Sequence, residues 1–278
     1  DEMLTLTAKG LELNPKFFVP FGANQGMTIR DNGEMELQRH YSDLAIDKLG
    51  PPRQRHSELS LRDKDLAFGL QRVFETAYFH LLNLLHRLAP SDRVVMAGGC
   101  ALNSVANGKL FGETPFRETC IQPAAGDEGL ALGAALYVSN VELKEKKRFV
   151  MRDAYLGPEF SEDAIKRELE RSGVPYGRVV GWFQGRMEWG PRALGNRSIL
   201  AHPGLPNMKD VLNARIKHRE WFRPFAPSVL AERQSEIFEH DHPSPFMLHV
   251  YKIRPAWRER LVAVNHVDDT GRLQPVAR

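Results

Sequence analysis

Cysteine is scarce in this sequence, and so are the features that mark secreted, membrane or strongly charged proteins. Only Cys100 and Cys120 occur among 278 residues, and neither belongs to a C-x-x-C pair. This argues against a disulfide framework and favours a reducing cytoplasm. No apolar run is long enough to cross a bilayer, and the first residues lack a secretory pattern. The formal charge of +3 is too small to indicate nucleic-acid or membrane binding.

The composition that remains is that of a globular protein, and 278 residues suffice for one or two domains. Irregular or mixed structure is predicted for the first sixty residues. A long helix is predicted after Ser60, where Asp63 completes a weak capping box, and Pro90 ends it. Apolar residues recur there at helical spacing, so this stripe is expected to face a core. Its members are Leu66, Leu70, Val73, Ala77, Leu81, Leu84 and Leu88.

Strands alternate with helices further along the chain. The sequence predicts strands at 93–97 and 119–122 and helices at 100–110 and 130–141. This order is typical of an α/β core with parallel strands. A charged stretch from Leu143 to Asp153 lacks apolar periodicity, so a domain boundary is predicted between residues 147 and 148. A second mixed α/β region is expected beyond it, with helices at 161–172 and 208–216 and strands at 178–183 and 226–231.

Two glycine-bearing loops are candidate binding sites. Gly98 and Gly99 turn the first strand into a helix, and such a turn presents helix-end N–H groups to an anion, with Asn103 as an additional donor. Simple packing explains this loop equally well. In Gly126-Asp-Glu-Gly129, Asp127 is a candidate ligand for a divalent ion that binds nucleotide phosphates. On these residues alone, helix capping by Asp127 is the favoured interpretation.

Two basic segments carry more information than either loop. One is Glu188-Trp-Gly-Pro-Arg-Ala-Leu-Gly-Asn-Arg-Ser198 and the other is Lys217-His-Arg-Glu-Trp-Phe-Arg-Pro-Phe-Ala-Pro227. Guanidinium groups match phosphate oxygens and stay charged at physiological pH, while the prolines and glycines restrict or shape the backbone. These segments predict a preorganised site for phosphate or carbamoyl phosphate. The candidate anion ligands are Arg192, Arg197, Lys217, Arg219 and Arg223.

Two further expectations accompany this site. Trp189, Trp221 and Phe222 are expected to form a partly dry wall, which would strengthen the attraction between cation and phosphate. The alternative places these aromatic side chains in the core. Some of the arginines are alternatively expected to pair with Glu188 and Glu220.

The ordered set of motifs resembles the NodU/CmcH O-carbamoyltransferases, over most of the chain after about residue 45. The matching segments are Met96–Asn103, Gln122–Gly129, Gly181–Arg186, Gly190–Ser198, Arg223–Pro227, Ser244–Met247, His266–Asp268 and Thr270–Arg272. The resemblance implies an α/β fold with two modules. Residues 1–147 would form the C-terminal half of an actin/hexokinase-like domain that transfers the carbamoyl group. Residues 148–278 would form a YrdC-like domain that makes carbamoyl adenylate.

The resemblance also implies substrates and residue roles. Carbamoyl phosphate and ATP would give carbamoyl adenylate, and the carbamoyl group would pass to the hydroxyl of a small molecule such as a sugar or an antibiotic. No nucleic-acid or membrane partner is expected. Arg192, Lys217 and Arg223 would be catalytic, and Gly98, Gly99 and Asn103 would bind the nucleotide. Asp127 would bind Fe²⁺ or a similar divalent ion.

The sequence departs from the family pattern at both ends. The family has a metal-binding histidine pair upstream and an Asn-Thr-Ser-Phe-Asn-type motif downstream, and neither occurs here. Both ends are therefore expected to be cut, which would leave the metal and carbamoyl phosphate sites incomplete. Two alternatives stay open at this point. One is a non-catalytic regulator that binds nucleotides or anions, and the other is an enzyme with the chemistry of threonylcarbamoyl transferases or sugar kinases.

Overall fold

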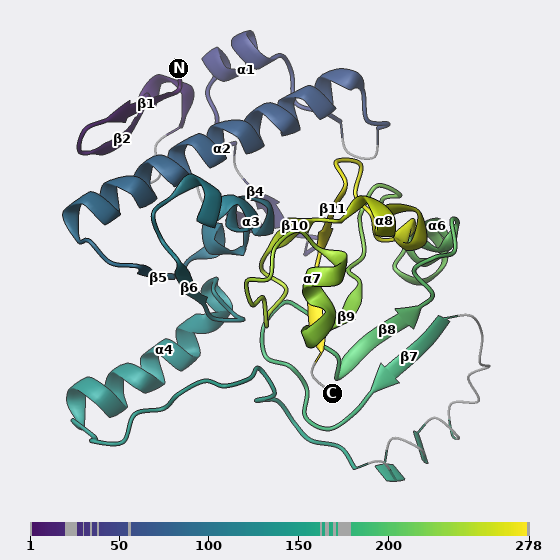
Figure 1. The fold of residues 1–278 in the computed structure, drawn as a ribbon. Coiled ribbons are helices and arrows are strands. Elements are labelled where there is room, and N and C mark those ends of the chain that lie inside the picture. Colours follow the sequence, from purple (N-terminus) through teal and green to yellow (C-terminus); the bar gives the residue numbers. More distant parts are fainter. Residues whose placement is uncertain are drawn as a thin grey trace. The chain divides into compact units, whose positions relative to one another are not determined.

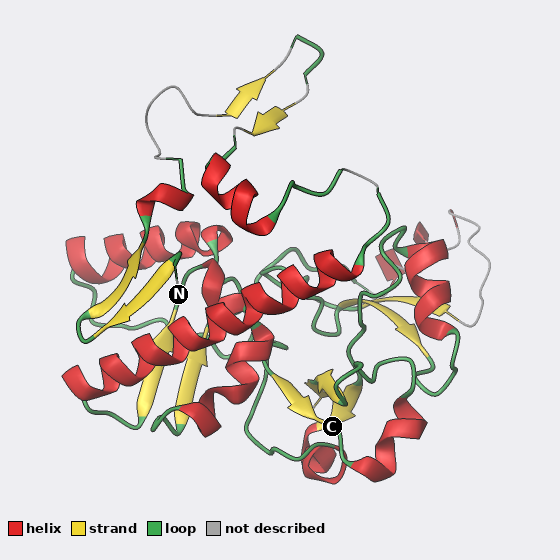
Figure 2. Ribbon diagram, turned by 90° about the horizontal axis from the view of Figure 1, so that it is seen from above, coloured by secondary structure: helices red, strands yellow, loops and turns green. Residues whose placement is uncertain are grey.

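The computed structural model describes residues 2–19, 27–29, 31–33, 35–37, 39–54, 57–161, 163–164, 167–168, 171 and 179–276. This part of the chain is mixed α/β, and its strands pair two by two in small sheets (Figure 1, Figure 2). Residue contacts gather in two units, one of Asp1–Ser91 with Glu113–Pro115, the other of Asp92–Gly112 with Phe116–Arg278. This division follows contacts and not folding modules, so the predicted boundary after residue 147 stays a prediction.

The first unit begins with short strands and a short helix. These elements are β1 (Leu4–Thr7), β2 (Gly10–Leu13), β3 (Met27–Ile29), β4 (Met35–Leu37) and α1 (Asp43–Leu49). β1 pairs antiparallel with β2, and β3 with β4. The Nε2 atom of His80 lies 2.9 Å from the carbonyl oxygen of Thr7 and 3.0 Å from that of Gly10, which ties the first hairpin to the long helix that follows.

The long helix α2 (Leu61–Leu88) has the predicted start. The Ser60 hydroxyl accepts from the Asp63 N–H, and the Asp63 carboxylate accepts from the Ser60 N–H at 2.9 Å, which completes a capping box. The prediction that the apolar stripe faces a core was wrong. Four of its seven members are exposed, namely Leu70, Val73, Leu81 and Leu88. The buried positions are Glu75 and Leu82, which lie off the stripe, because burial depends on a covering surface and not on periodicity alone. Among the described residues, no helix is long and apolar enough to cross a membrane.

The second unit contains the predicted parallel strands. β5 (Arg93–Met96) pairs in parallel with β6 (Glu118–Ile121), and α3 (Ser104–Glu113) lies between them in the chain. The helix predicted from residue 100 begins at Ser104. A 3-10 turn at Gly99–Leu102 comes first, and the Asn103 side chain then accepts from the Ala106 N–H at 3.1 Å. α4 (Leu130–Tyr137) follows a 3-10 turn at Asp127–Gly129 and continues into a π-helical turn at Val138–Glu142.

The rest of the second unit is built from short elements. They are β7 (Val179–Phe183), β8 (Arg197–Ala201), α6 (Met208–Val211), β9 (Ser228–Leu230), α7 (Gln234–Ile237), β10 (Val250–Lys252), α8 (Pro255–Arg258), β11 (Thr270–Arg272) and β12 (Gln274–Val276). β7 pairs antiparallel with β8, β10 antiparallel with β11, and β9 parallel with β12. The predicted strands at 178–183 and 226–231 are present, and α6 with a π-helical turn at Leu212–Ile216 fills the helix predicted at 208–216. The helix predicted at 161–172 falls largely outside the described residues.

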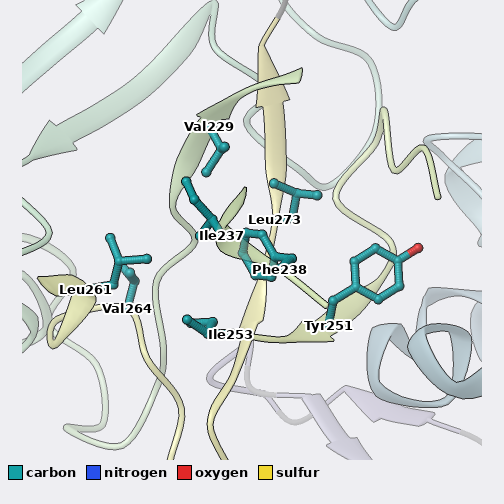
Figure 3. Close-up of a cluster of buried hydrophobic side chains, with 8 residues drawn as sticks. All are labelled: Val229, Ile237, Phe238, Tyr251, Ile253, Leu261, Val264 and Leu273. Atoms are coloured by element: carbon teal, nitrogen blue, oxygen red, sulfur yellow. The ribbon is translucent and has the colours of Figure 1, made fainter. Parts of the chain in front are cut away.

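A buried cluster of apolar side chains holds these short elements together. Its members are Val229, Ile237, Phe238, Tyr251, Ile253, Leu261, Val264 and Leu273 (Figure 3). Figure 3 shows the Tyr251 hydroxyl pointing away from the other side chains, and the pKa of this buried phenol is raised. Since its members come from several strands, helices and connecting segments between residues 229 and 273, the cluster fixes how these segments lie against one another.

The imidazole of His249 is buried in the second unit. Its Nδ1 atom lies 3.2 Å from the Ser244 hydroxyl, and its ring stacks on Tyr251 at 5.8 Å. Nε2 is buried and has no hydrogen-bond partner among the described residues. Burial, and to a smaller extent the charge of His242, lowers the pKa of His249 to about 4. The folded protein therefore disfavours the imidazolium.

We expect stability to fall between pH 6.5 and about 4 for this reason. The unfolded chain takes up the His249 proton below pH 6.5, whereas the folded chain resists it until about pH 4, so stability is lost as pH falls through this window. The full effect is roughly 3 kcal/mol, of which about 2 kcal/mol arises between pH 7 and pH 5. Urea unfolding at both pH values, in the native chain and in His249→Phe, measures it. An equal pH dependence in the two proteins would contradict this role of His249.

Candidate functional site

A pocket of about 540 Å³ in the second unit is lined by cations from both basic segments. Apolar side chains form part of its wall, among them Phe225, Met208 and Val264. Six lysine and arginine side chains also line it, namely Arg192, Arg197, Lys209, Lys217, Arg219 and Arg272. No aspartate or glutamate occurs among the described lining residues. The chemistry of the pocket therefore favours a small anion with an apolar or uncharged part.

The first basic segment is folded around a buried carboxylate. The Oε1 atom of Glu188 accepts from the N–H groups of Leu194 at 2.7 Å, Asn196 at 2.6 Å and Arg197 at 3.2 Å. Its Oε2 atom accepts from Nε of Arg197 at 3.1 Å. Gly190 and Gly195, with φ of 106° and 119°, supply backbone conformations that other residues rarely adopt. The segment is thus a closed loop, with Arg192 between its two ends.

Arg192 and Arg197 have different surroundings in this loop. The guanidinium of Arg197 pairs with Glu188 and donates to the Gly190 carbonyl at 2.8 Å, so its charge is balanced within the protein. Arg192 is partly buried, and its Nε has no hydrogen-bond partner among the described residues. Burial lowers the pKa of Arg192, because few groups replace the lost water. Arg192 is therefore available to a ligand in a way that Arg197 is not.

The second basic segment is braced by Asn213, a side chain that is 1% exposed. Its Nδ2 donates to the carbonyls of Trp221 and Arg223, and its Oδ1 accepts from Nε of Arg219 at 2.7 Å. The Arg219 guanidinium also lies 4.6 Å from the centroid of the Phe225 ring. Burial, followed by the charge of Arg223, lowers the pKa of Arg219. These contacts fix the backbone from which Lys217, an exposed side chain, lines the pocket.

Arg223 does not join Arg192 and Lys217 in the pocket lining. Its Nε lies 2.7 Å from the Glu220 carboxylate, and both side chains are half exposed. The expected pairing of some arginines with Glu188 and Glu220 is thus confirmed, by Arg197 and Arg223 respectively. The geometry brings together two of the three residues predicted to grip carbamoyl phosphate.

The predicted aromatic wall is formed by another residue. Neither Trp189 nor Trp221 nor Phe222 lines the pocket, whereas Phe225 does. Trp221 and Phe222 pack edge-to-face on each other, with ring centroids 5.9 Å apart, and both are exposed. The expectation was wrong because the sequence shows which aromatic residues are near the cations but not which way the loop turns them.

The sequence predictions missed two pocket-lining cations, Lys209 and Arg272. Arg272 lies on β11 and has a buried Nε without a partner in the described part of the chain. Burial, then the charges of Arg192 and Arg219, lowers the pKa of Arg272 to about 10. These shifts indicate that the cations lie close enough to repel one another. The sequence signal for Arg272 was the Thr270-Gly-Arg272 motif. This motif matches the family pattern, but no role was predicted for its arginine.

The two glycine-bearing loops and the first basic segment are linked within the second unit. The Gly98 N–H donates to the Ala125 carbonyl at 2.7 Å, which joins the first loop to the second. A Cβ at Gly190 would lie 2.7 Å from the carbonyl oxygen of Pro123, so the first basic segment packs closely against the second loop. Asn107, fully buried on α3, donates to the carbonyls of Ala101 at 2.8 Å and Leu248 at 3.0 Å. Leu248 follows Met247, which lines the pocket.

The nucleotide role of Gly98, Gly99 and Asn103 stays a prediction. Gly98 has a φ of 95° and begins the 3-10 turn, as a glycine loop at a helix end requires. Part of the Asn103 side chain is used inside the protein, because its Oδ1 caps α3. The turn and the cap explain why these residue types occur here whether or not a ligand binds.

Asp127 lies exposed in the 3-10 turn before α4. The N-cap residue is Gly126 and no side chain caps this turn, so the geometry does not support the capping interpretation. Within the described residues, no three His, Cys, Asp or Glu side chains are grouped as a metal site requires. The residues present therefore do not fit a complete metal site, and the metal role of Asp127 stays a prediction.

The sequence of the chain is similar to that of known proteins over most of its length. The family model "Carbamoyltransferase N-terminus" matches residues 33–136, and "Carbamoyltransferase C-terminus" matches residues 173–278. Nodulation protein NolNO of Sinorhizobium fredii is 40% identical over 84% of this chain and 39% of its own length. Nodulation protein NolO of Bradyrhizobium diazoefficiens is 40% identical over 84% of the chain and 48% of its own length. An uncharacterized Synechocystis protein is 38% identical over 99% of the chain and 50% of its own length. The chain thus spans half or less of the length of these relatives.

Proposed function

Because the chain belongs to the carbamoyltransferase family, we propose that its cationic pocket binds carbamoyl phosphate for the formation of carbamoyl adenylate. The observation that carries this proposal is the convergence of Arg192, Lys217 and Arg272 on one pocket whose described lining contains no carboxylate. The carbamoyl group would then pass to a hydroxyl of a small-molecule acceptor. This activity is proposed for the full-length protein, because the chain spans half or less of the length of these relatives.

The pocket suits the charges of the proposed reaction. Carbamoyl adenylate contains one phosphorus atom, which comes from the α-phosphate of ATP. Atom balance therefore requires carbamoyl phosphate, ATP and water to give carbamoyl adenylate, phosphate and pyrophosphate. Both leaving groups are anions, and fixed guanidinium and ammonium groups stabilise the negative charge that develops on them. Arg192 and Arg272 need little rearrangement for this, since their buried Nε atoms have no competing partner among the described residues.

The three residues predicted to be catalytic take different parts in this proposal. Arg192 and Lys217 contact carbamoyl phosphate from the two basic segments. Arg272 contacts it from β11. Arg223 takes part by exchanging Glu220 for the ligand, since its backbone is held by Asn213 beside the pocket-lining Arg219. Such an exchange is inexpensive because an exposed ion pair contributes little stability.

The finer assignments belong to the same proposal. Residues 1–147 would be part of an actin/hexokinase-like domain, in which Gly98, Gly99 and Asn103 hold the nucleotide, and residues 148–278 part of a YrdC-like domain. The contacts of Gly98 and Gly190 with the 122–129 loop support a short path between the two sites. A sugar or antibiotic-like hydroxyl is the proposed acceptor class. The similarity to the nodulation proteins NolNO and NolO favours a nodulation-related acceptor.

Pyrophosphate release tests the proposed function. With ATP and carbamoyl phosphate together, the full-length protein is expected to release pyrophosphate, and with either alone it is not. Arg192→Ala is expected to lower the affinity for carbamoyl phosphate about 100-fold, because a partly buried charge-assisted contact is lost. Arg233→Ala is the matched control, since Arg233 pairs with Glu236 and does not line the pocket.

Two outcomes separate the alternatives. An anion-binding regulator would bind carbamoyl phosphate without releasing pyrophosphate from ATP under any of these conditions. If Arg192→Ala and the control both bound carbamoyl phosphate normally, this pocket would not be the carbamoyl phosphate site.

A further inference from the structure

The first basic segment, which contains the Gly190-Pro-Arg192 loop, includes one carboxylate, Glu188. An anion-binding site is expected to exclude carboxylates. The Glu188 side chain is fully buried, with 0% exposure, and belongs to the segment that carries two pocket-lining arginines. A carboxylate near the pocket reduces its positive potential. Glu188 must therefore contribute something that outweighs this electrostatic loss.

The contacts of Glu188 show what that contribution is. Its two oxygen atoms accept from three backbone N–H groups and one guanidinium, at residues 194, 196 and 197. The paired Arg197 in turn donates to the Gly190 carbonyl, on the other side of Arg192. One carboxylate therefore closes the loop at both ends, and all of its partners lie within nine residues of it. Arg192 is the pocket-lining residue between these two fixed points.

Glu188 also balances the charge of one arginine and leaves that of the other free. Arg197 is paired at 3.1 Å, whereas Nε of Arg192 has no partner among the described residues. Without Glu188, the loop would present two unpaired guanidinium groups on a backbone whose donors at Leu194 and Asn196 had lost their acceptor. Buried donors without an acceptor favour local rearrangement, which would move Arg192.

We propose that Glu188 is a positioning residue, which holds the Gly-Pro-Arg loop in the conformation that directs Arg192 at a bound phosphate group. This inference rests on the proposed function, because it assumes that the pocket takes a phosphate-bearing ligand. It goes beyond that function by assigning a role to an acidic residue that cannot itself contact an anion favourably. The role depends on the hydrogen bonds that both carboxylate oxygens accept, and not on the long-range field of the negative charge.

The substitution Glu188→Gln distinguishes positioning from simple electrostatics by the sign of its effect. It keeps the size of the side chain, removes the negative charge, and replaces one acceptor oxygen with an amide that cannot accept from Arg197. If only charge mattered, the variant would bind anions more tightly, because the pocket would gain one net positive charge. If Glu188 positions Arg192, the variant binds anions more weakly.

The experiment measures the affinity of the full chain for inorganic phosphate and for carbamoyl phosphate by titration calorimetry. Glu188→Gln is expected to weaken both by about tenfold or more, while circular dichroism shows a retained fold. Glu75→Gln is the matched control, because Glu75 is also buried, at 5% exposure, but lies on α2 in the first unit. It is expected to bind both ligands normally.

The outcomes are decisive in each direction. Equal or tighter binding by folded Glu188→Gln would overturn the positioning role while leaving the proposed function intact. A native chain that binds neither ligand would overturn the proposed function and this role together. If Glu188→Gln does not fold, the double substitution Glu188→Gln, Arg197→Gln removes the unpaired cation, and normal phosphate affinity in that protein would overturn the role equally.

Discussion

Replacing Arg272 by methionine is expected to stabilise the ligand-free protein and to abolish most of its affinity for carbamoyl phosphate. The pKa of Arg272 is lowered to about 10, chiefly by burial, and its Nε has no partner in the described part of the chain. The lowering from 12.5 corresponds to roughly 3 kcal/mol. Since the guanidinium is protonated in both folded and unfolded chains at pH 7, this whole cost applies there. Methionine has a similar length and carries no charge.

Urea unfolding with and without carbamoyl phosphate measures both effects. We expect Arg272→Met to gain as much as about 2 kcal/mol without ligand, and to lose about 100-fold in affinity because a buried cation no longer faces the anion. Arg258→Met is the matched control on the neighbouring α8. Arg258 pairs with Asp269 at 2.8 Å and does not line the pocket, so its loss should lower stability slightly and leave binding unchanged. A less stable Arg272→Met that still binds carbamoyl phosphate would contradict this account.

Replacing Gly108 by alanine is expected to destabilise the second unit by about 3 kcal/mol, although alanine is the better helix former. A Cβ at Gly108 would overlap the backbone carbonyl of Val250, so α3 and β10 would have to separate. The same movement would strain the Asn107 hydrogen bonds that join Ala101 to Leu248. The effect would therefore reach both the Gly98 turn and the pocket wall at Met247.

Gly112 provides the matched control for this substitution. It lies on the same helix, and a Cβ there would meet nothing within 4 Å. Gly112→Ala is expected to stabilise the chain by up to about 1 kcal/mol, through helix propensity alone. Thermal unfolding of the two variants gives the comparison. If Gly108→Ala were as stable as Gly112→Ala, the packing of α3 on β10 would be wrong, and so would the link through Asn107 between Ala101 and Leu248.

Features fixed by local chemistry could be predicted from the sequence. The capping box at Ser60 depends on residues three positions apart, and β5 and β6 were recognisable from short apolar strands around a helix. The two basic segments were identified because arginine, proline and glycine occur together in them. Their convergence on one pocket is confirmed for Arg192 and Lys217, which lie 25 positions apart in the sequence.

Features fixed by packing could not be predicted in the same way. Arg192 and Arg197 occur in one loop, and only the Glu188 contacts show which of them is paired. Arg272 is a single arginine on a three-residue strand, and its importance depends on neighbours about 50 and 80 positions away. The side on which Trp221 and Phe222 lie was likewise set by the Asn213 hydrogen bonds to the loop backbone, which no local pattern reports.

The most direct test of the central claim is a calorimetric titration of carbamoyl phosphate into the native chain, Arg192→Ala and Lys217→Ala. The two residues come from separate segments, so only a shared pocket makes both of them matter for one ligand. We predict a single saturable site that weakens in both variants, and in the native chain also weakens as salt is raised. Saturable binding that is unchanged in both variants, or no binding to the native chain, would contradict the account.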